Sequence, residues 1–156
     1  MKLIFKCLSL LLFVAITASA QENKKGSSLI FPLGNKVTNS NFIGDVWLQM
    51  LVSSDTVYNS NIGSVTFAPG ARTRWHSHAG GQLLLVTEGK GLYQEKGQPV
   101  KLIRKGDVVK CQPNVVHWHG ATPTDAMTHI AIGTNTHKGS VVWLDHVTDL
   151  EYKSFK

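Results

Sequence analysis

The sequence contains little cysteine and few charged side chains. Only two of its 156 residues are cysteines, and Asp, Glu, Lys and Arg together make up 17%. Cys7 lies inside an apolar N-terminal run, so Cys111 has no partner for an internal disulfide once that run is removed. We expect the Cys111 thiol to be a small buried group, and the fold must be stable without a disulfide.

Positive charge is in excess but is not concentrated anywhere. The chain has 16 Lys and Arg residues against 10 Asp and Glu residues, a formal net charge of +6. It lacks the arginine-rich stripe and the interleaved aromatic residues that are typical of nucleic-acid binding. The excess charge is therefore expected to be a solvated surface, and nucleic acid is not an expected partner.

The single long apolar run stands at the N-terminus. Residues 1–6 are short and basic, residues 7–17 are almost continuously apolar, and residues 18–20 read Ala-Ser-Ala. A signal peptide has these three parts in this order. The alternative is a membrane anchor, but the run is shorter than the roughly 20 residues that a spanning helix needs. We expect cleavage between Ala20 and Gln21 and an exported protein, periplasmic or secreted, with no membrane segment in its mature form.

The rest of the chain suits one domain. Residues 21–28 are polar, and we predict a flexible leader over residues 21–40 and a single domain over residues 41–156. From Val46 onward, short apolar or alternating runs recur between turns that contain Gly or Pro. The predicted strands are residues 46–52, 62–67, 83–87, 91–95, 100–103, 108–110, 116–121, 126–132 and 141–144.

Short strands at such even spacing favour an all-β fold, a small antiparallel barrel or jelly roll. Only the tail has a helical signal. Thr148 and Glu151 stand at the positions of a capping box, which predicts a last turn or two of helix.

Two pairs of histidines indicate a metal site. His76 and His78 form one His-x-His pair, and His117 and His119 form another. Side chains alternate between faces in a strand, so the two histidines of a pair point the same way and can share an ion. Gln82 stands just before an apolar run and can add an oxygen ligand. The alternative is that these are ordinary surface or hydrogen-bonded histidines.

The spacing of the first pair resembles the first motif of the cupin superfamily, in which Gly, His-x-His, Glu and a second Gly follow at fixed distances. Gly70, His76, His78, Gln82 and Gly89 fall on those positions without a gap, with Gln82 in the place of Glu. The resemblance implies a single-domain cupin β-barrel.

The second cupin motif is matched less closely, by Gly106, Pro113 and His117. Asn114 replaces a glycine of the motif, and Ala121 stands where the motif ends in Asn. Asn is the non-glycine residue most tolerant of a left-handed turn, so we expect the hairpin before His117 to survive the change.

Residues 70–82, 117–121, 126–132 and 142–149 are similar to the small bacterial cupins that act as manganese-dependent hydroxynitrile lyases. The resemblance implies an (R)-mandelonitrile lyase-like carbon–carbon lyase, which cleaves or forms a cyanohydrin such as mandelonitrile from an aldehyde and cyanide. It also implies one divalent metal ion, a small-molecule substrate and a homo-oligomer.

The resemblance assigns His76, His78, Gln82 and His117 as the metal ligands. These ligands are neutral, so the ion keeps its full double charge and is a stronger Lewis acid than it would be beside a glutamate. Alternatively, Gln82 hydrogen-bonds a ligand histidine. Manganese is implied by the resemblance alone, because intrinsic affinity favours copper or zinc, and iron or nickel also suits such ligands.

A lyase needs a proton acceptor beside the metal. His129 lies on an inward-facing strand and is our first candidate; His119 shares a face with His117 and is the second. Either histidine can instead be a hydrogen-bonded core residue. Alternation along the same strands predicts which side chains face His129 and line a substrate pocket: Gly63, Val65, Phe67, Ala131 and Gly133.

Small side chains at these pocket positions fit either an open pocket or a narrow, tightly packed core.

The same metal site also suits two other classes of function. A dioxygenase would bind substrate and oxygen together at the open metal positions, and a binding protein would hold a metal or small molecule without catalysis.

Overall fold

The computed structural model describes residues 29–155. The predicted signal peptide and residues 21–28 of the predicted leader lie outside the described residues. Strands make up almost all of the regular structure, which confirms the all-β prediction. The strands are β1 (Asn35–Lys36), β2 (Phe42–Ile43), β3 (Val46–Val52), β4 (Ser60–Phe67), β5 (Arg72–Thr73), β6 (His76–His78), β7 (Gln82–Glu95), β8 (Lys101–Arg104), β9 (Val108–Cys111), β10 (His117–Ala121), β11 (Met127–Thr134) and β12 (Val141–Trp143). The 3-10 helix η1 (Thr136–Lys138) and the helix α1 (Asp149–Tyr152) complete the chain.

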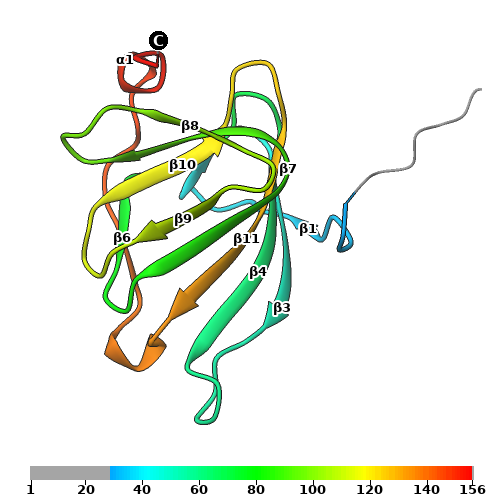
Figure 1. The fold of residues 1–156 in the computed structure, drawn as a ribbon, viewed down its shortest axis with the longest axis vertical. Helices are drawn as coiled ribbons and strands as arrows, with labels where there is room; N and C mark the ends of the chain where they lie inside the picture. Colours follow the sequence, from blue (N-terminus) through cyan, green and yellow to red (C-terminus); the bar gives the residue numbers. More distant parts are fainter. Residues whose placement is uncertain (1–28, 156) are drawn as a thin grey trace, which may run out of the picture.

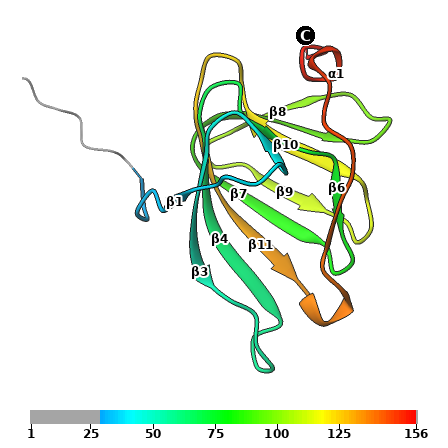
Figure 2. The same cartoon turned by 180° about the vertical axis from the view of Figure 1, so that it is seen from behind.

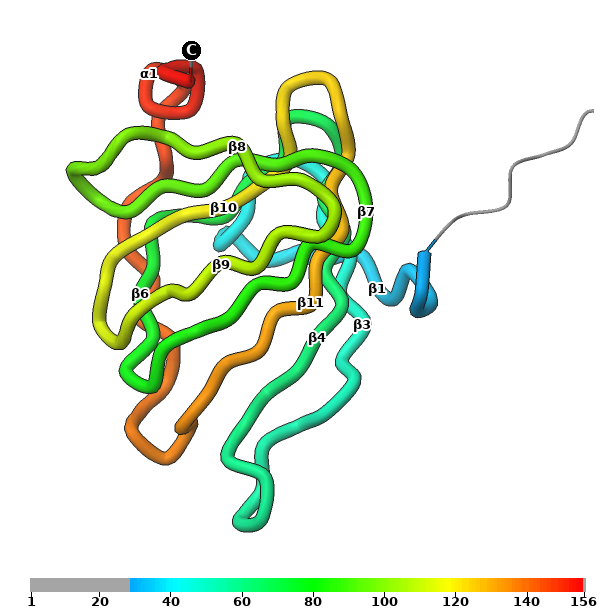
Figure 3. The backbone as a smooth tube through the Cα atoms, in the orientation of Figure 1, coloured from blue at the N-terminus to red at the C-terminus, as the bar shows by residue number. Residues whose placement is uncertain are grey.

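The strands pair antiparallel in two sheets that share β7 (Figure 1). In one sheet the order is β1, β3, β4, β11 and β7, with β9 on the other side of β7. In the other sheet β7 pairs with β8 and β10, and β10 pairs with β5 and β6. Figure 3 shows that the two sheets curl round a common interior as a half-barrel.

The long strand β7 corrects the prediction of separate strands at residues 83–87 and 91–95. It continues through Gly89, which has a φ of 75°. A side chain at Gly89 would collide with the carbonyl oxygen of Ala126. The glycine therefore bends the strand from one sheet into the other and lets the start of β11 approach closely. The sequence pattern had indicated a turn at this position.

Two buried clusters lie on opposite faces of the second sheet, because neighbouring residues of β7 and β10 point to opposite sides. Tyr93 belongs to the cluster inside the half-barrel, together with Phe67, Leu84 and other aliphatic side chains. Leu92 and Trp118 belong to the outer cluster. Cys111 is buried in the inner cluster, as expected for an unpaired thiol.

The C-terminal tail covers the outer cluster, running along the side of the half-barrel up to α1 (Figure 2). Thr148 and Glu151 form the predicted capping box at the start of α1. The Tyr152 hydroxyl donates to the Ala121 carbonyl oxygen at 2.8 Å, and the Arg72 guanidinium lies 4.5 Å from the centre of the Tyr152 ring. These contacts fix the tail against the strand that carries two of the histidines.

Residues 29–40 of the predicted leader are described, and they already contact the sheet. Asn35 and Lys36 form β1, opposite Leu48 and Trp47 of β3. No helix within residues 29–155 has the length and apolar character needed to cross a membrane.

Candidate metal centre and cavity

The strand register brings the two histidine pairs together. His117 of β10 stands directly opposite His76 of β6, and the centres of their rings are 4.3 Å apart. The turn before His117 forms as predicted, since Asn114 has a left-handed φ of 62°. Gln82 begins β7, and its Oε1 lies 3.2 Å from Nε2 of His117. Residues that are far apart in the sequence thus converge because three strands meet at one place.

Three of these histidines have ligand atoms within 4.8 Å of one another: His76, His117 and His119. His78 lies beside this group, with its ring centre 5.3 Å from that of His76 and 5.8 Å from that of His117. The structure therefore brings all four candidate ligands close together, and it adds His119 to the same cluster.

Hydrogen bonds leave the Nε2 atoms of two histidines free to bind an ion. His76 Nδ1 lies 2.9 Å from the Arg74 carbonyl oxygen, and His117 Nδ1 lies 2.9 Å from that of Val115. A carbonyl oxygen only accepts, so both Nδ1 atoms carry the proton and both Nε2 atoms present a lone pair. The lone pair of His117 then faces an acceptor oxygen of Gln82, an arrangement that a cation between them would stabilise.

His78 supplies a further sign of a missing partner. Its Nε2 is buried and has no hydrogen-bond partner among the described residues. An unpaired buried nitrogen costs free energy unless another group binds it. Imidazole nitrogens and an amide oxygen suit a divalent transition metal, so the residues present fit such an ion.

His119 and His129 form a second buried pair next to the cluster. His129 Nε2 lies 3.2 Å from His119 Nδ1. Both side chains are almost fully buried, and the Phe67 ring packs against both, with its centre 5.8 Å from that of His119 and 5.6 Å from that of His129. Of the two histidines, His119 lines the cavity described below and His129 lies behind it.

Burial keeps this histidine cluster neutral. It lowers the pKa of His78 and of His129 to about 4. Burial, reinforced by neighbouring histidines, lowers the pKa of His76 and of His119 well below the usual value. Neutral imidazoles are the form that binds a metal ion or accepts a proton at neutral pH.

A cavity of about 840 Å³ opens beside the cluster. His76, His78, Gln82 and His119 form part of its wall. Gly63, Val65, Ala131 and Gly133, four of the five residues predicted for the pocket, also line it. Phe67, the fifth, is fully buried behind His119 and does not line the cavity.

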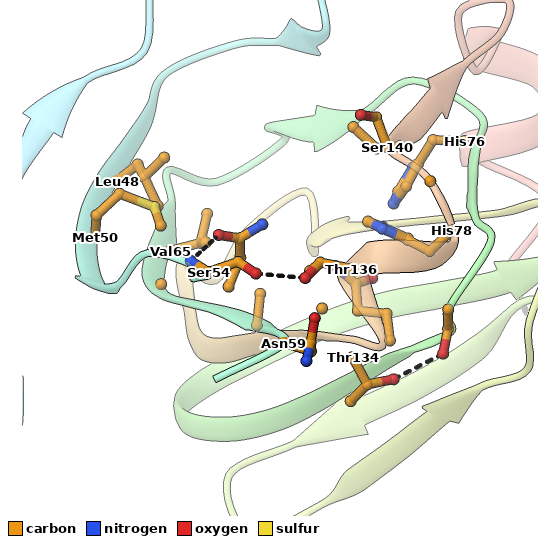
Figure 4. Close-up of a pocket in the computed structure, with 18 of the residues that line it drawn as sticks. Leu48, Met50, Ser54, Asn59, Val65, His76, His78, Thr134, Thr136 and Ser140 are labelled. Carbon is orange, nitrogen blue, oxygen red and sulfur yellow. Dashed lines mark hydrogen bonds between the residues drawn. The ribbon is translucent and has the colours of Figure 1, made fainter. Parts of the chain in front are cut away.

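Figure 4 shows how the wall of the cavity is divided. His76 and His78 lie on one side, and Leu48, Met50 and Val65 lie on the other. The mouth lies between the β3–β4 loop and η1, because the residues that line the cavity there, such as Asn59 and His137, are exposed. There the hydroxyl groups of Ser54 and Thr136 are in contact, and the Thr136 N–H donates to the Asn59 carbonyl oxygen at 3.2 Å.

Residues 63–133 match the family of cupin domains. An (R)-mandelonitrile lyase from Granulicella tundricola is 53% identical over 90 residues, which are 58% of this chain and 69% of that protein. The chain belongs to the cupin family. The resemblance recognised from the two histidine motifs is thereby confirmed.

Solved structures of similar proteins support the fold. A cupin-like protein from Thermotoga maritima is 51% identical, with a TM-score of 0.79 over 81% of this cupin and 97% of that chain. A conserved protein with a double-stranded β-helix domain from Klebsiella pneumoniae is 18% identical, with a TM-score of 0.58 over 76% of this cupin and 98% of that chain. The second likeness shows the fold alone.

The mouth of this cupin's cavity was not found from the sequence. Ser54, Asn59, Thr136 and Ser140 all line it, and they all lie outside the segment that matches the cupin domain. His137 is exposed and lines it too. Ordinary loop residues of this kind carry no motif, so only their shared position in space identifies them.

Proposed function

We propose that this cupin is a metal-dependent lyase that cleaves or forms a cyanohydrin such as mandelonitrile. The observation that carries the proposal is the neutral histidine cluster in the wall of a large cavity, with a second histidine pair beside it. The 53% identity to an (R)-mandelonitrile lyase supports the same reaction class.

We assign His76, His78, Gln82 and His117 as the residues that hold the metal ion. His78 is included because its buried Nε2 otherwise lacks a partner. His119 is left out because the cupin-motif positions already supply four ligands, although its ligand atom lies within 4.8 Å of those of His76 and His117. A bound divalent ion would supply Lewis acidity to a substrate oxygen or to the departing cyanide. We propose manganese as that ion on the resemblance of the sequence motifs to manganese-dependent hydroxynitrile lyases alone.

His119 is the better candidate for the base, with His129 as its positioning residue. His119 reaches the cavity, and its low pKa keeps it unprotonated at neutral pH. It accepts the hydroxyl proton of the cyanohydrin while the carbon–carbon bond breaks, the carbonyl forms and cyanide leaves. His129 holds the ring in place through the contact between Nε2 and Nδ1. The order of preference is thus the reverse of that expected from the sequence.

The test is to measure cyanide release from mandelonitrile by the manganese-loaded protein, with oxygen uptake recorded in parallel. We expect cyanide release without oxygen uptake. His78→Ala should remove the metal, as measured by elemental analysis. His119→Ala should keep the metal and lower turnover by about a hundredfold or more, the usual loss when a general base is removed.

Oxygen uptake with a phenolic or dicarbonyl substrate, and no cyanide release, would replace the lyase by the dioxygenase. If neither cyanide release nor oxygen uptake is detected, the remaining function is that of a protein that binds a metal or small molecule without catalysis. Full metal content in His78→Ala, or loss of metal in His119→Ala, would show that His119 is the ligand in place of His78.

We also propose export, with cleavage between Ala20 and Gln21, on the order of basic, apolar and small residues at the N-terminus. Mass spectrometry of protein recovered from the periplasm or the medium tests this. A chain that still begins with Met1, or that stays in the cytoplasm, would contradict it.

A further inference from the structure

The cavity is larger than the reaction alone requires. Its volume of about 840 Å³ lies in the upper part of the range, roughly 300–1,000 Å³, that is typical of sites for ligands of drug size. A cyanohydrin with a single aromatic ring would fill only a small part of it. The remaining volume leaves room for a further portion of the natural substrate.

The lining changes in character along β4 from the mouth inward. Asn61 lies nearest the mouth, Gly63 follows, and Val65 is four residues from Asn61 along the strand. Four residues of strand span about 13 Å. On the neighbouring strand β3, Met50 stands opposite Gly63 and Leu48 opposite Val65. The wall that faces the histidines is therefore apolar in its inner part.

The mouth is polar but almost without charge. Its hydrogen-bonding side chains belong to Asn59, Asn61, Thr136 and Ser140. Asn61 Oδ1 already accepts from the Ser54 N–H at 2.8 Å and the Thr136 hydroxyl contacts that of Ser54, so each keeps only part of its hydrogen-bonding capacity for a ligand. No lysine or arginine is present among the described residues that line the cavity. The ionisable groups at the mouth are His137 and Asp55, and the Asp55 carboxylate already accepts from the Val57 N–H at 2.8 Å.

We propose that the natural substrate is an elongated, uncharged molecule with a hydroxyl or amide group at the end remote from the reacting carbon. This inference rests on the proposed function for the reacting end only. The reacting end lies by His119 and the metal ligands, the apolar middle lies on Leu48, Met50 and Val65, and the polar end hydrogen-bonds Asn59, Thr136 or Ser140 at the mouth. A carboxylate at that end is disfavoured, because it would lose part of its hydration and would find no lysine or arginine in the cavity lining to pair with.

The test measures binding of three aldehydes of matched length to the manganese-loaded protein by calorimetry, without turnover. The probes are 4-(2-hydroxyethoxy)benzaldehyde, 4-propoxybenzaldehyde and 4-(carboxymethoxy)benzaldehyde. We expect the hydroxyl compound to bind roughly three- to tenfold more tightly than the propoxy compound, the size of one net hydrogen bond. The carboxylate should bind most weakly.

The triple variant Asn59→Leu, Thr136→Val and Ser140→Ala should abolish the preference for the hydroxyl compound. Gln112→Leu, at an exposed position that does not line the cavity, is the control and should keep it. If the triple variant does not fold, the comparison of the three aldehydes on the parent still decides. Equal affinity, a preference for the propoxy or carboxylate compound, or no binding of the hydroxyl compound overturns the inference. None of these results bears on cyanide release from mandelonitrile, which tests the reaction separately.

Discussion

At the scale of single residues, the Gln82 side chain sets the charge of the candidate metal centre. Its amide oxygen lies 3.2 Å from the imidazole of His117, in the position where many cupins carry a glutamate. The surrounding histidines are kept neutral by burial. The whole ligand set therefore adds no negative charge, and a bound divalent ion would keep its full charge.

Gln82→Glu should strengthen metal binding and weaken catalysis. A carboxylate is the better ligand for a hard cation, but it cancels one unit of the charge that polarises the substrate. We expect a lower Kd for Mn²⁺ by calorimetry and a fall in kcat for mandelonitrile of about tenfold or more, equal to at least about 1.4 kcal/mol of barrier. Gln112→Glu is the matched control at an exposed position. An unchanged kcat with tighter metal binding would contradict the charge argument.

His129→Ala should keep the metal and lower turnover, because His119 loses the group that faces its Nδ1. We expect a loss of about a hundredfold, comparable to that for a general acid or base. His129→Gln retains a hydrogen-bonding side chain and should restore part of the rate. If the glutamine variant is as slow as the alanine variant while both keep the parent's thermal stability, His129 acts on the substrate and does not position His119.

At the scale of elements, β7 is the strand that connects the two sheets and carries Gln82 at its start. Its early residues pair with β11 and β9, and its later residues pair with β8 and β10. The metal ligands of β7 and β10 can meet only if this strand bends. Gly89 provides the bend, since its φ of 75° is strained for any other residue type.

Gly89→Ala should destabilise the protein more than Gly97→Ala. Both glycines have a positive φ, but only at Gly89 would a methyl group meet a backbone carbonyl, that of Ala126; at Gly97 it would meet open space. Left-handed strain alone costs about 1–3 kcal/mol of unfolding free energy, and the collision at Gly89 adds to it. Urea unfolding of both variants measures the difference. Equal losses would show that β11 moves aside without cost.

At the scale of the whole molecule, the buried histidines make stability depend on pH. The pKa of His78 and of His129 is about 4 in the folded protein and about 6.5 in an unfolded chain. Between these values the unfolded chain binds more protons than the folded one, so folding stability is lost as pH falls. Despite its partial burial, hydrogen bonds from Thr148 lower the pKa of Glu151 from 4.5 to about 2, so this carboxylate titrates largely below the window of the histidines.

The unfolding temperature, measured with a chelator present, should therefore be steady above pH 6.5 and fall between pH 6.5 and 4. His129→Gln lacks one of the titrating groups and should show a shallower fall over the same range. A flat profile in the parent between pH 6.5 and 4 would mean that these histidines are accessible to protons in the folded state.

Local rules in the sequence were enough for most of the strands and for the capping box. Alternation of apolar residues gave most strand positions, and Thr148 and Glu151 gave the start of α1. His76, His78, Gln82 and His117 were predicted as ligands because a shared ligand site imposes fixed spacing on short stretches of chain, and the structure brings them close together. Properties that depend only on neighbours in the chain can be read from the chain itself.

Three features were decided only by the tertiary structure. Gly89 bends a continuous strand, because pairing with β11 and β10 on either side of it outweighs its local tendency to form a turn. His119, and not His129, reaches the cavity, because β10 and β11 lie in different sheets that meet only through β7 and hold their side chains at different depths. The mouth joins residues of the β3–β4 loop to residues of η1, although the contact between Ser54 and Thr136 spans 82 positions of sequence. Such distances between separate strands and loops are fixed by how the sheets close on each other, and no short stretch of sequence contains that information.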